Sequence, residues 1–226
     1  MKVYTKVPRR LAWDRSGKAP IKVRWVDVNK GTAEAPQIRS RLVAKEIKVN
    51  ERPDLFAATP PLEALKLILS FTASGQDKGK CLMHNDVSRA YFHAPAMRDV
   101  FVEIAKEDQE EGDHERCGWL NFSMYGTRDA ARNWEDAYSG ALIKLGFVRG
   151  VATPCVFRHK AKDIDTLVHG DDFMSSGSQI QLKWLQGELE KMFTLKSKMI
   201  GADPSLEKEM KVLGRNVRFN KGGDHI

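Results

Sequence analysis

Alternating apolar and polar residues predict a strand hairpin near the start of the chain. Residues 21–28 (Ile-Lys-Val-Arg-Trp-Val-Asp-Val) and residues 39–47 (Arg-Ser-Arg-Leu-Val-Ala-Lys-Glu-Ile) both follow the period of a strand. The connection between them contains Gly31 and Pro36, which favour a turn. We therefore expect the two segments to pair antiparallel. Residues 1–20 are polar and hold two prolines, so they should be irregular.

Apolar residues at helical spacing predict three helices further along the chain. The first follows Pro61, at a position where proline is tolerated, and Gly75 ends it. The second follows Thr127, which suits an N-cap, and ends at Gly146, while the third follows Ser178. Short apolar runs predict strands at residues 81–87, 155–157, 166–168 and 173–175.

This order of elements predicts an α+β fold in which helices pack on an antiparallel sheet. At 226 residues the chain is long enough for one large domain or two small ones. Residues 105–118 are acidic and hydrophilic and predict an exposed loop. The polar sequence from Lys196 onward is ambiguous until residues 211–219, which predict one strand or two, and residues 220–226 carry no fold signal.

The chain carries a net charge of +7, and lysine and arginine are concentrated in its first 50 residues. Neutralisation of phosphates by such side chains drives nucleic-acid binding, so a polyanionic partner fits this charge. A soluble protein with a basic surface is the alternative that charge by itself leaves open.

Cysteine usage and hydropathy exclude other classes of protein. The three cysteines, Cys81, Cys117 and Cys155, are odd in number and widely spaced, which fits neither a disulfide framework nor a paired zinc site. We therefore expect a reducing compartment. No apolar run is long enough to span a bilayer and the N-terminus lacks the apolar core of a signal peptide, so we expect an intracellular protein without a membrane partner.

Three aspartates carry the clearest candidate chemistry. Asp171 and Asp172 are adjacent, between the predicted strands at 166–168 and 173–175, and Asp86 ends an upstream apolar run. Neighbouring carboxylates at a tight turn repel each other and add nothing to packing, whereas a hard cation such as Mg²⁺ prefers carboxylate oxygens. Asp86 beside Asp171 is the minimal geometry for two-metal phosphoryl transfer. Asp172 ranks slightly below the other two as a metal ligand, because neighbouring residues on a regular strand point to opposite faces. The alternative to a metal site is a turn whose aspartates are simply solvated.

Several ordered blocks of residues resemble one protein family. Residues 40–45 (Ser-Arg-Leu-Val-Ala-Lys) are similar to its Ala-Arg-Leu-Val-Ala-Lys strand, and residues 86–92 (Asp-Val-Ser-Arg-Ala-Tyr-Phe) to its first catalytic motif. Residues 123–134 are similar to its Ser-Leu-Tyr-Gly-Leu-Lys-Gln-Ala-Pro-Arg-x-Trp block, and residues 169–172 (His-Gly-Asp-Asp) stand where it has Tyr-Val-Asp-Asp. The family is the reverse transcriptase domain of copia-type LTR retrotransposon Pol polyproteins, and the resemblance covers roughly residues 20–219.

The chain departs from the family pattern at a few positions. His169 and Gly170 replace the tyrosine and valine before the paired aspartates, Ala131 replaces a proline, and residues 127–129 (Thr-Arg-Asp) replace Leu-Lys-Gln. The aspartates themselves are intact. These departures bear on fidelity, on affinity for nucleotides and on activity.

The resemblance implies the fold of a right-hand polymerase, with fingers, an antiparallel palm sheet backed by helices, and a thumb that is absent or truncated. It assigns residues 1–79 to the fingers, as basic hairpin and helix, and residues 80–95 to the palm, as the first catalytic strand. Residues 96–122 become a fingers insertion with the acidic loop, and residues 123–210 the palm with the Asp-Asp hairpin. Residues 211–226 begin the primer-grip and thumb region.

The same resemblance implies an RNA-directed DNA polymerase, which adds dNTPs to the 3′ end of a primer on an RNA or DNA template. Asp86, Asp171 and Asp172 would be catalytic ligands of two Mg²⁺ ions, with Mn²⁺ as a substitute; one ion activates the primer 3′-hydroxyl and the other holds the triphosphate and the leaving pyrophosphate. Lys196 or Lys198 is a candidate general acid, with a surface lysine as the alternative. The implied partners are template, primer, dNTPs and the rest of the Pol polyprotein, in the cytoplasm, a virus-like particle or the nucleus.

Six further residues are candidates for nucleotide binding: Arg39, Arg41, Lys45, Tyr91, Gly126 and Arg128. The first three share one face of the strand at 39–47, which the family places in the fingers against the triphosphate. Tyr91 stands where related polymerases hold an aromatic under the sugar, whose ring would exclude a 2′-hydroxyl. Gly126 and Arg128 begin a helix whose N-terminus favours anions. The alternatives are a solvated strand face, a half-buried core aromatic and a turn glycine.

Two other functions compete with polymerisation. The chain is alternatively a decayed or domesticated fragment that folds and binds nucleic acid without catalysis, which an incomplete thumb and the His169-Gly170 pair favour. The third option is another Mg²⁺-dependent nucleotidyltransferase or nuclease that uses the same three carboxylates. The ordered blocks outside the aspartates argue against it.

Overall fold

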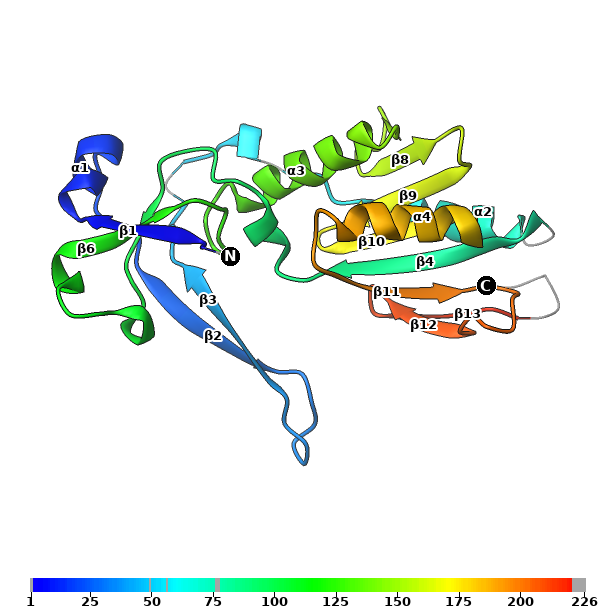
Figure 1. Ribbon diagram of the computed structural model, residues 1–226, viewed down its shortest axis with the longest axis horizontal. Coiled ribbons are helices and arrows are strands. Elements are labelled where there is room, and N and C mark those ends of the chain that lie inside the picture. Colours follow the sequence, from blue (N-terminus) through cyan, green and yellow to red (C-terminus); the bar gives the residue numbers. More distant parts are fainter. Residues whose placement is uncertain (1, 49, 56, 76–77, 221–226) are drawn as a thin grey trace. The chain divides into compact units, whose positions relative to one another are not determined.

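The structure is a computed structural model that describes residues 2–48, 50–55, 57–75 and 78–220 (Figure 1). The chain folds into two compact units. The first unit comprises residues 1–57 and 91–137, and the second unit residues 58–90 and 138–226. None of the helices in the described part of the chain has the length and hydropathy needed to cross a membrane.

The first unit contains a three-stranded antiparallel sheet. Its strands are β1 (Tyr4–Pro8), β6 (Arg116–Leu120) and β5 (Phe101–Val102), in the order β1-β6-β5. The short helix α1 (Arg10–Ser16) follows β1, and its Ala12 packs with Phe101 and Cys117. The short 3₁₀ helices of the chain include η1 (Pro53–Leu55), η3 (Ala90–His93), η4 (Lys106–Asp108) and η5 (Asp113–Glu115).

The expectation that residues 1–20 are irregular is wrong, because β1 and α1 lie within them. β1 forms through its pairing with β6, in which Tyr4 lies opposite Leu120. Its residues are half-buried by that pairing rather than by an apolar pattern of their own. A strand that depends on a partner so far away in the sequence leaves little local signal.

The expectation that residues 105–118 form an exposed loop is partly wrong. β6 already begins at Arg116, and the side chain of Asp113 is buried. The Asp113 carboxylate accepts a hydrogen bond from Lys6 Nζ at 2.6 Å. The acidic segment is therefore held against β1 by a charged contact, which its hydrophilic composition does not reveal.

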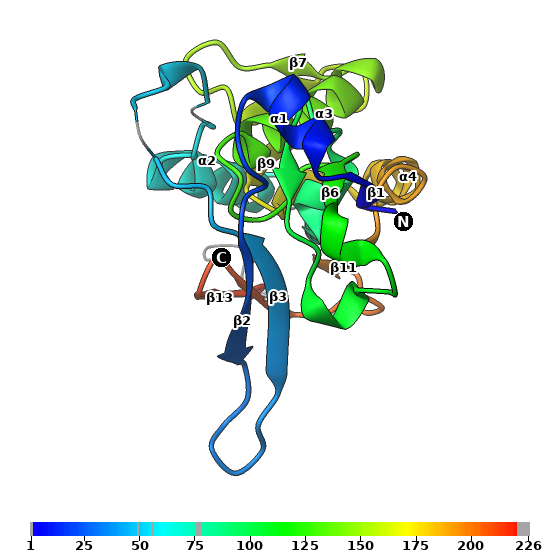
Figure 2. The ribbon, with the colours of Figure 1, turned by 90° about the vertical axis from the view of Figure 1, so that its left-hand side faces the viewer.

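The predicted hairpin is confirmed. β2 (Val23–Asn29) pairs antiparallel with β3 (Ile38–Ala44), from Val23 opposite Ala44 to Asn29 opposite Ile38. Figure 2 shows the two strands side by side along their length. The end of β3 is anchored in the first unit, because Ala44 belongs to a buried cluster with Val100, Val102, Leu120 and Met124.

The second unit holds a six-stranded antiparallel sheet in the order β11-β4-β10-β9-β8-β7. Its strands are β4 (Lys80–Val87), β7 (Val148–Arg149), β8 (Val156–His159), β9 (Ile164–His169), β10 (Asp172–Ser178) and β11 (Leu195–Ile200). β12 (Glu209–Val212) and β13 (Arg215–Arg218) form a separate antiparallel pair, so the predicted strand region at 211–219 is two strands.

Helices cover both faces of the six-stranded sheet (Figure 1). α2 (Leu62–Ala73) packs Ile68 in one cluster with Leu82 of β4 and Met174 of β10. Phe173 of β10 points to the other face and contacts Tyr138 of α3 (Ala130–Lys144), with 5.7 Å between ring centroids. The same face is covered by α4 (Gln179–Glu190) (Figure 1). Burial on both faces explains why β4, β9 and β10 contain apolar runs rather than a clean alternation.

β11 is an element that the sequence left ambiguous. It forms because it pairs with β4, with Leu195 opposite Val87 and Ile200 opposite Leu82. Its outward positions are lysines, so its composition is that of a polar segment. The tertiary pairing overrides this weak local preference.

The predicted helices are present, but their caps differ from expectation. Thr127 is not an N-cap, because α3 begins at Ala130 and the Thr127 hydroxyl donates to the carbonyl oxygen of Met124 at 2.9 Å. Ser178 occupies the N-cap position of α4 without a side-chain hydrogen bond. Pro61 occupies the N-cap position of α2.

The two units do not share their boundaries with the predicted fingers and palm. α2 lies within the residues 1–79 that the resemblance assigns to the fingers, yet it packs in the second unit. β4 and the β9–β10 hairpin, which hold the three candidate aspartates, also lie in the second unit. The names fingers and palm remain predictions.

Candidate active site

Two of the candidate aspartates lie directly opposite each other in the second unit. Asp172, the first residue of β10, is paired with Asp86 of β4. Directly opposed residues point to the same face, with Cβ atoms about 5 Å apart. Both aspartates are partly exposed. Because like charges directly opposite each other destabilise a sheet, this pair is not explained by packing.

The third aspartate lies in the turn that joins β9 to β10. His169 pairs with Asp172, so Gly170 and Asp171 form a two-residue connection. Gly170 has a φ of +62°, while Asp171 is not among the residues with positive φ, as in a type II′ turn with glycine at its first central position. The Val87 N–H donates to the Asp171 carbonyl oxygen at 2.9 Å, which ties the turn to the end of β4.

The geometry bears on the expected ranking of the aspartates as metal ligands, which stays a prediction. The sequence ranked Asp172 below Asp171, because two neighbours on a regular strand cannot point the same way. In the structure it is Asp172 that shares a sheet face with Asp86, whereas Asp171 belongs to the turn. All three are at the same end of the two adjacent strands β4 and β10, and their roles as metal ligands remain predictions.

His84 is a neighbour of the aspartates that the sequence did not indicate. Its Nε2 lies 2.6 Å from Oδ1 of Asp172. His84 is two residues before Asp86 on β4, so strand alternation puts both side chains on one face, and this spacing was the available signal. Lys196 of β11 lies opposite Asp86 on the other side. Nitrogen-bearing side chains therefore flank the two opposed carboxylates.

The donor set suits a hard divalent cation. Mg²⁺ is commonly bound through one or two carboxylates together with water and substrate phosphates, and Asp86 and Asp172 provide two adjacent carboxylates. Across residues 2–48, 50–55, 57–75 and 78–220, no three His, Cys, Asp or Glu side chains come close enough to form a complete metal site. The residues therefore fit the ion by their chemistry, with substrate oxygens needed to complete its coordination.

Gly170 is expected to relieve strain in this turn. A Gly170→Val variant, which restores the residue of the family pattern, should lower the free energy of unfolding by about 1–2 kcal/mol because an L-residue is strained at positive φ. Nothing lies within 4 Å of a Cβ built on Gly170, so the Cβ itself meets no neighbour. Chemical denaturation measures the change. The control is Gly187→Ala in α4, where nothing lies within 4 Å of an added Cβ either. This variant should raise the free energy of unfolding by about 0.5–1 kcal/mol. If both variants changed the free energy of unfolding equally, the turn geometry would be contradicted.

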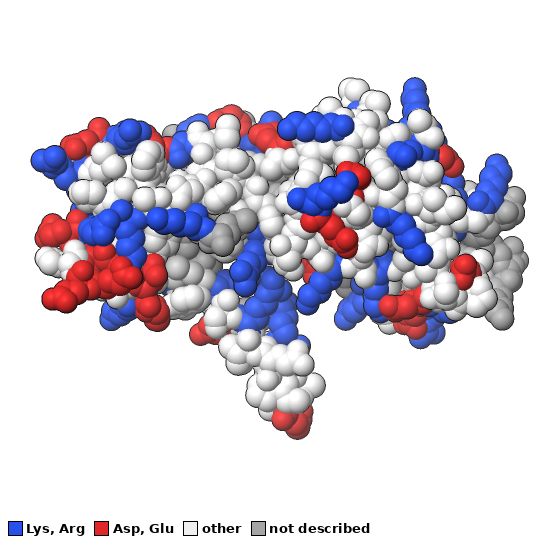
Figure 3. All heavy atoms as spheres, viewed as in Figure 1, with Lys and Arg blue, Asp and Glu red and all other residues white. Residues whose placement is uncertain are grey.

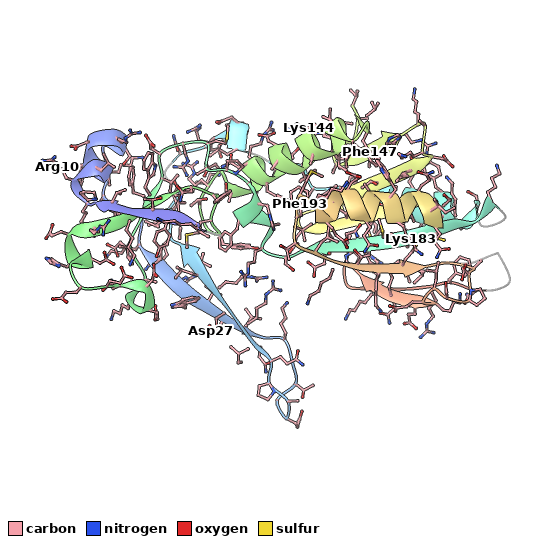
Figure 4. All side chains as sticks on the ribbon, in the orientation of Figure 1. Arg10, Asp27, Lys144, Phe147, Lys183 and Phe193 are labelled. Atoms are coloured by element: carbon pink, nitrogen blue, oxygen red, sulfur yellow. The ribbon has the colours of Figure 1, made fainter. Side chains whose placement is uncertain are left out.

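The basic candidates of the first unit lie on the β2–β3 hairpin. Arg39 is opposite Val28 and Arg41 opposite Val26, so both point to one face, as alternation predicted. Lys45 follows the end of β3, and its N–H continues the pairing by donating to the carbonyl oxygen of Lys22 at 2.8 Å. Figure 3 shows Lys and Arg side chains on the upper part of the hairpin, whereas its lower part is white and its tip is acidic. Asp27, labelled in Figure 4, lies on β2 opposite Ser40 and so on the other face.

The structure brings three of the candidates together around a fourth residue, Tyr125. The Arg41 guanidinium carbon lies 5.6 Å from the centroid of the Tyr125 ring. Tyr91, in η3, has its ring centroid 4.7 Å from that of Tyr125. Gly126 follows Tyr125 with a φ of +85°, and a Cβ on Gly126 would lie 2.0 Å from the Ala44 carbonyl oxygen. The close approach that needs this glycine is thus to β3, which supports the turn-glycine alternative.

Arg128 is engaged within the protein. Its guanidinium donates to the side chain of Asn50 at 2.7 Å and to the Asn50 carbonyl oxygen at 2.6 Å, and its N–H donates to Glu46 at 2.8 Å. Arg128 therefore holds the segment that follows β3. It also lines a cavity of mixed charge with Lys48, Glu51 and Arg52. Contact with a nucleotide remains a prediction.

An ion-pair network supports the start of α3. Arg98 donates to Glu46 at 2.6 Å and to the buried Asp129 at 2.9 Å. Burial acts to raise the pKa of Asp129, but the hydrogen bond and charge of Arg98 outweigh it, so this pKa lies below the usual range of an aspartate. Asp129 is therefore ionised at neutral pH, and the network joins residue 46 to the turn before α3.

The chain matches a protein-family model over most of its length. The model is that of the reverse transcriptase (RNA-dependent DNA polymerase) family, and it matches residues 8–211. The retrovirus-related Pol polyprotein from transposon TNT 1-94 of Nicotiana tabacum is 26% identical over 189 residues. This match covers 80% of the chain but only 14% of the tobacco polyprotein, so the chain spans a small part of its relative's length.

Two solved structures of telomerase match the chain at low sequence identity. Telomerase from Candida albicans, in complex with a TWJ fragment of telomeric RNA, gives a TM-score of 0.56 at 8% identity, covering 96% of this chain and 46% of that one. Apo telomerase from Candida tropicalis, truncated from its C-terminal domain, gives a TM-score of 0.48 at 10% identity, covering 88% and 54%. The first likeness is consistent with a polymerase fold built from helices and antiparallel sheets.

The resemblance seen in the ordered sequence blocks is confirmed by these comparisons. The family match spans both the basic hairpin of the first unit and the aspartate-bearing strands of the second. The tobacco relative is the polyprotein of a copia-type retrotransposon. The chain therefore belongs to the reverse transcriptase (RNA-dependent DNA polymerase) family, in the form found in copia-type retrotransposon Pol polyproteins.

Proposed function

We propose that the chain is an RNA-directed DNA polymerase domain that adds dNTPs to the 3′ end of a primer on an RNA or DNA template. The observation that carries this proposal is the opposed pair Asp86 and Asp172 at the end of β4 and β10, with Asp171 in the adjoining turn. Two negative charges in direct opposition cost stability, so the pair makes sense if a cation offsets them during catalysis.

Asp86, Asp171 and Asp172 would hold two Mg²⁺ ions, for which Mn²⁺ can substitute. When bound, such ions activate the primer 3′-hydroxyl and stabilise charge on the transferred phosphate and the leaving pyrophosphate. The strands β4 and β10 pair along seven residues, from Asp86 opposite Asp172 to Lys80 opposite Ser178. This pairing would hold the backbone of both aspartates in place before substrate arrives, which limits the reorganisation that catalysis needs.

The first unit supplies the residues for nucleotide handling. Arg39 and Arg41 share one face of the hairpin, and Lys45 follows the end of β3. A triphosphate would meet the two guanidinium groups as bidentate donors and the lysine as a point charge. Tyr91 would lie under the sugar and exclude a 2′-hydroxyl. In this proposal the hairpin belongs to the fingers and the six-stranded sheet to the palm, and the remaining parts of a longer Pol polyprotein act with them in the cytoplasm or a virus-like particle.

Primer extension on an RNA template with Mg²⁺ or Mn²⁺ tests the proposal. The wild-type chain should extend the primer with dNTPs, and Asp171→Asn should abolish extension because it removes a metal-binding charge. The matched control is Asp136→Asn, since Asp136 is exposed on α3 and forms an ion pair with Arg132 of the same helix. This control should extend the primer as the wild type does.

The other candidate functions predict different results. If neither wild type nor variant extends the primer while salt-sensitive binding to template–primer is retained, the decayed or domesticated fragment is the better description. Cleavage of the nucleic acid that depends on Asp171 would instead identify a nuclease. Either result would contradict the polymerase proposal.

A further inference from the structure

An aromatic ring outside the predicted set of site residues lies at the centre of the candidate residues in the first unit. Tyr125 has its ring centroid 4.7 Å from that of Tyr91, at an interplanar angle of 46°, and 5.7 Å from that of Phe92, at 75°. The guanidinium carbon of Arg41 lies 5.6 Å from the same ring. We refer to Arg41, Tyr91, Phe92 and Tyr125 as the Tyr125 cluster. It joins β3 to η3 through one side chain.

The backbone that carries Tyr125 is fixed on β3. The Ala44 N–H donates to the Tyr125 carbonyl oxygen at 2.8 Å. Gly126 packs directly against β3. A Cβ on Gly126 would lie 2.0 Å from the Ala44 carbonyl oxygen and 2.6 Å from Cγ1 of Val43. The backbone of Tyr125 is therefore held at a fixed place relative to β3, which carries Arg41 three residues before Ala44.

The cluster lies where the core of the first unit meets its surface, because Phe92 also packs against the buried cluster that contains Ala44. All four side chains are partly exposed, in contrast to the fully buried rings of Trp134 and Phe173. Aromatic rings beside a guanidinium group suit a ligand that has an apolar ring face and an anionic group. A nucleoside triphosphate has both, since its sugar and base can lie against rings while its phosphates meet arginine.

We infer that Tyr125 is a positioning residue that sets the selectivity for deoxyribose over ribose. Its ring holds Tyr91 at the place where that side chain would meet the 2′ carbon of the sugar, and it holds Arg41 toward the phosphates. Sugar selection and phosphate binding are then coupled through one ring. The inference rests on the proposed function and deepens it.

The test compares Tyr125→Leu with the conservative Tyr125→Phe. The ratio of kcat/KM for dNTP to kcat/KM for rNTP should fall about 3- to 10-fold in Tyr125→Leu, which is the loss expected from removing an aromatic contact. KM for dNTP should rise more than kcat falls, because Arg41 loses its support. Tyr125→Phe keeps the ring, so its ratio of kcat/KM for dNTP to kcat/KM for rNTP should stay within about 2-fold of the wild-type ratio.

Trp25→Leu is a matched control on the same hairpin. Trp25 is an exposed aromatic on β2, opposite Leu42, and strand alternation puts it on the face away from Arg41. Its indole N–H donates to Glu107 at 3.0 Å, outside the cluster. The dNTP to rNTP ratio of this variant should equal that of the wild type.

A second measurement does not depend on catalysis. With 3-fluorotyrosine in place of the four tyrosines, the ¹⁹F resonance of Tyr91 can be assigned from a Tyr91→Phe variant. That resonance should shift in Tyr125→Leu and keep its position in Trp25→Leu, because only the first substitution removes the neighbouring ring.

The possible failures are distinguishable. If the wild-type chain incorporates no dNTP, the proposed function is contradicted. The shift of the Tyr91 resonance in Tyr125→Leu then tests by itself whether Tyr125 positions Tyr91. An active Tyr125→Leu with an unchanged dNTP to rNTP ratio overturns the inference. An unshifted Tyr91 resonance in Tyr125→Leu overturns it as well, and equal losses in Tyr125→Phe and Tyr125→Leu would assign the effect to the hydroxyl instead of the ring.

Discussion

An Asp172→Asn variant is expected to incorporate nucleotides about a thousandfold more slowly than the wild type, a loss of about 4 kcal/mol in transition-state stabilisation. The substitution removes one of the three carboxylate charges that would hold the catalytic ions. It should not lower the free energy of unfolding, because Asp172 lies directly opposite Asp86 and the change removes a repulsion. The asparagine oxygen can still accept a hydrogen bond from His84. Single-turnover primer extension and chemical denaturation measure the two quantities.

The pattern across variants separates catalysis from folding. Asp86→Asn should behave like Asp172→Asn, and the double variant should be hardly slower than either single one, because residues that act as a unit are not additive. A loss of activity that tracks a loss of stability would show instead that the pair serves the fold. Additive rate losses would contradict a shared role at one metal site.

A Gly126→Ala variant is expected to lose about 3 kcal/mol of unfolding free energy, which combines the strain of an L-residue at positive φ with a forced displacement of neighbouring backbone. Gly126 has a φ of +85°, and the added Cβ would lie 2.0 Å from the Ala44 carbonyl oxygen. Either β3 or the turn must shift, which disturbs the hydrogen bond from Ala44 to Tyr125. Chemical denaturation monitored by tryptophan fluorescence measures the loss.

Gly140→Ala is the matched control for this variant. Gly140 lies within α3, and nothing lies within 4 Å of a Cβ built on it. Alanine is the better helix former, so this variant should be more stable than wild type by about 0.5–1 kcal/mol. If Gly126→Ala were as stable as Gly140→Ala, β3 would not pack against the turn in the way described.

Much of the candidate site was predictable because its signals are local. The hairpin of β2 and β3 alternates apolar and polar residues around a connection with Gly31 and Pro36, and alternation is sufficient to put Arg39 and Arg41 on one face. The connection at Gly170 and Asp171 was likewise marked by two charged residues between apolar runs. The ordered blocks of the family spanned both regions, and the family match confirms them.

Tertiary structure decided which residues meet. Whether Asp171 or Asp172 shares a face with Asp86 depends on the register of β10 against β4, and a slip of one residue would reverse the answer. The contact of His84 with Asp172 and the Tyr125 cluster depend in the same way on strands and turns that are distant in sequence. No pattern within one segment specifies such a register.

The elements that the sequence left ambiguous or predicted wrongly share one physical cause. β1 and β11 carry polar residues, and each becomes a strand by pairing with a distant partner, β6 or β4. Periodicity in a sequence reports the burial of one segment's own face, which was sufficient for α2, α4 and the β2–β3 hairpin. It reports nothing about backbone hydrogen bonds to a strand elsewhere in the chain, and those bonds are formed only when the whole fold brings the partners together.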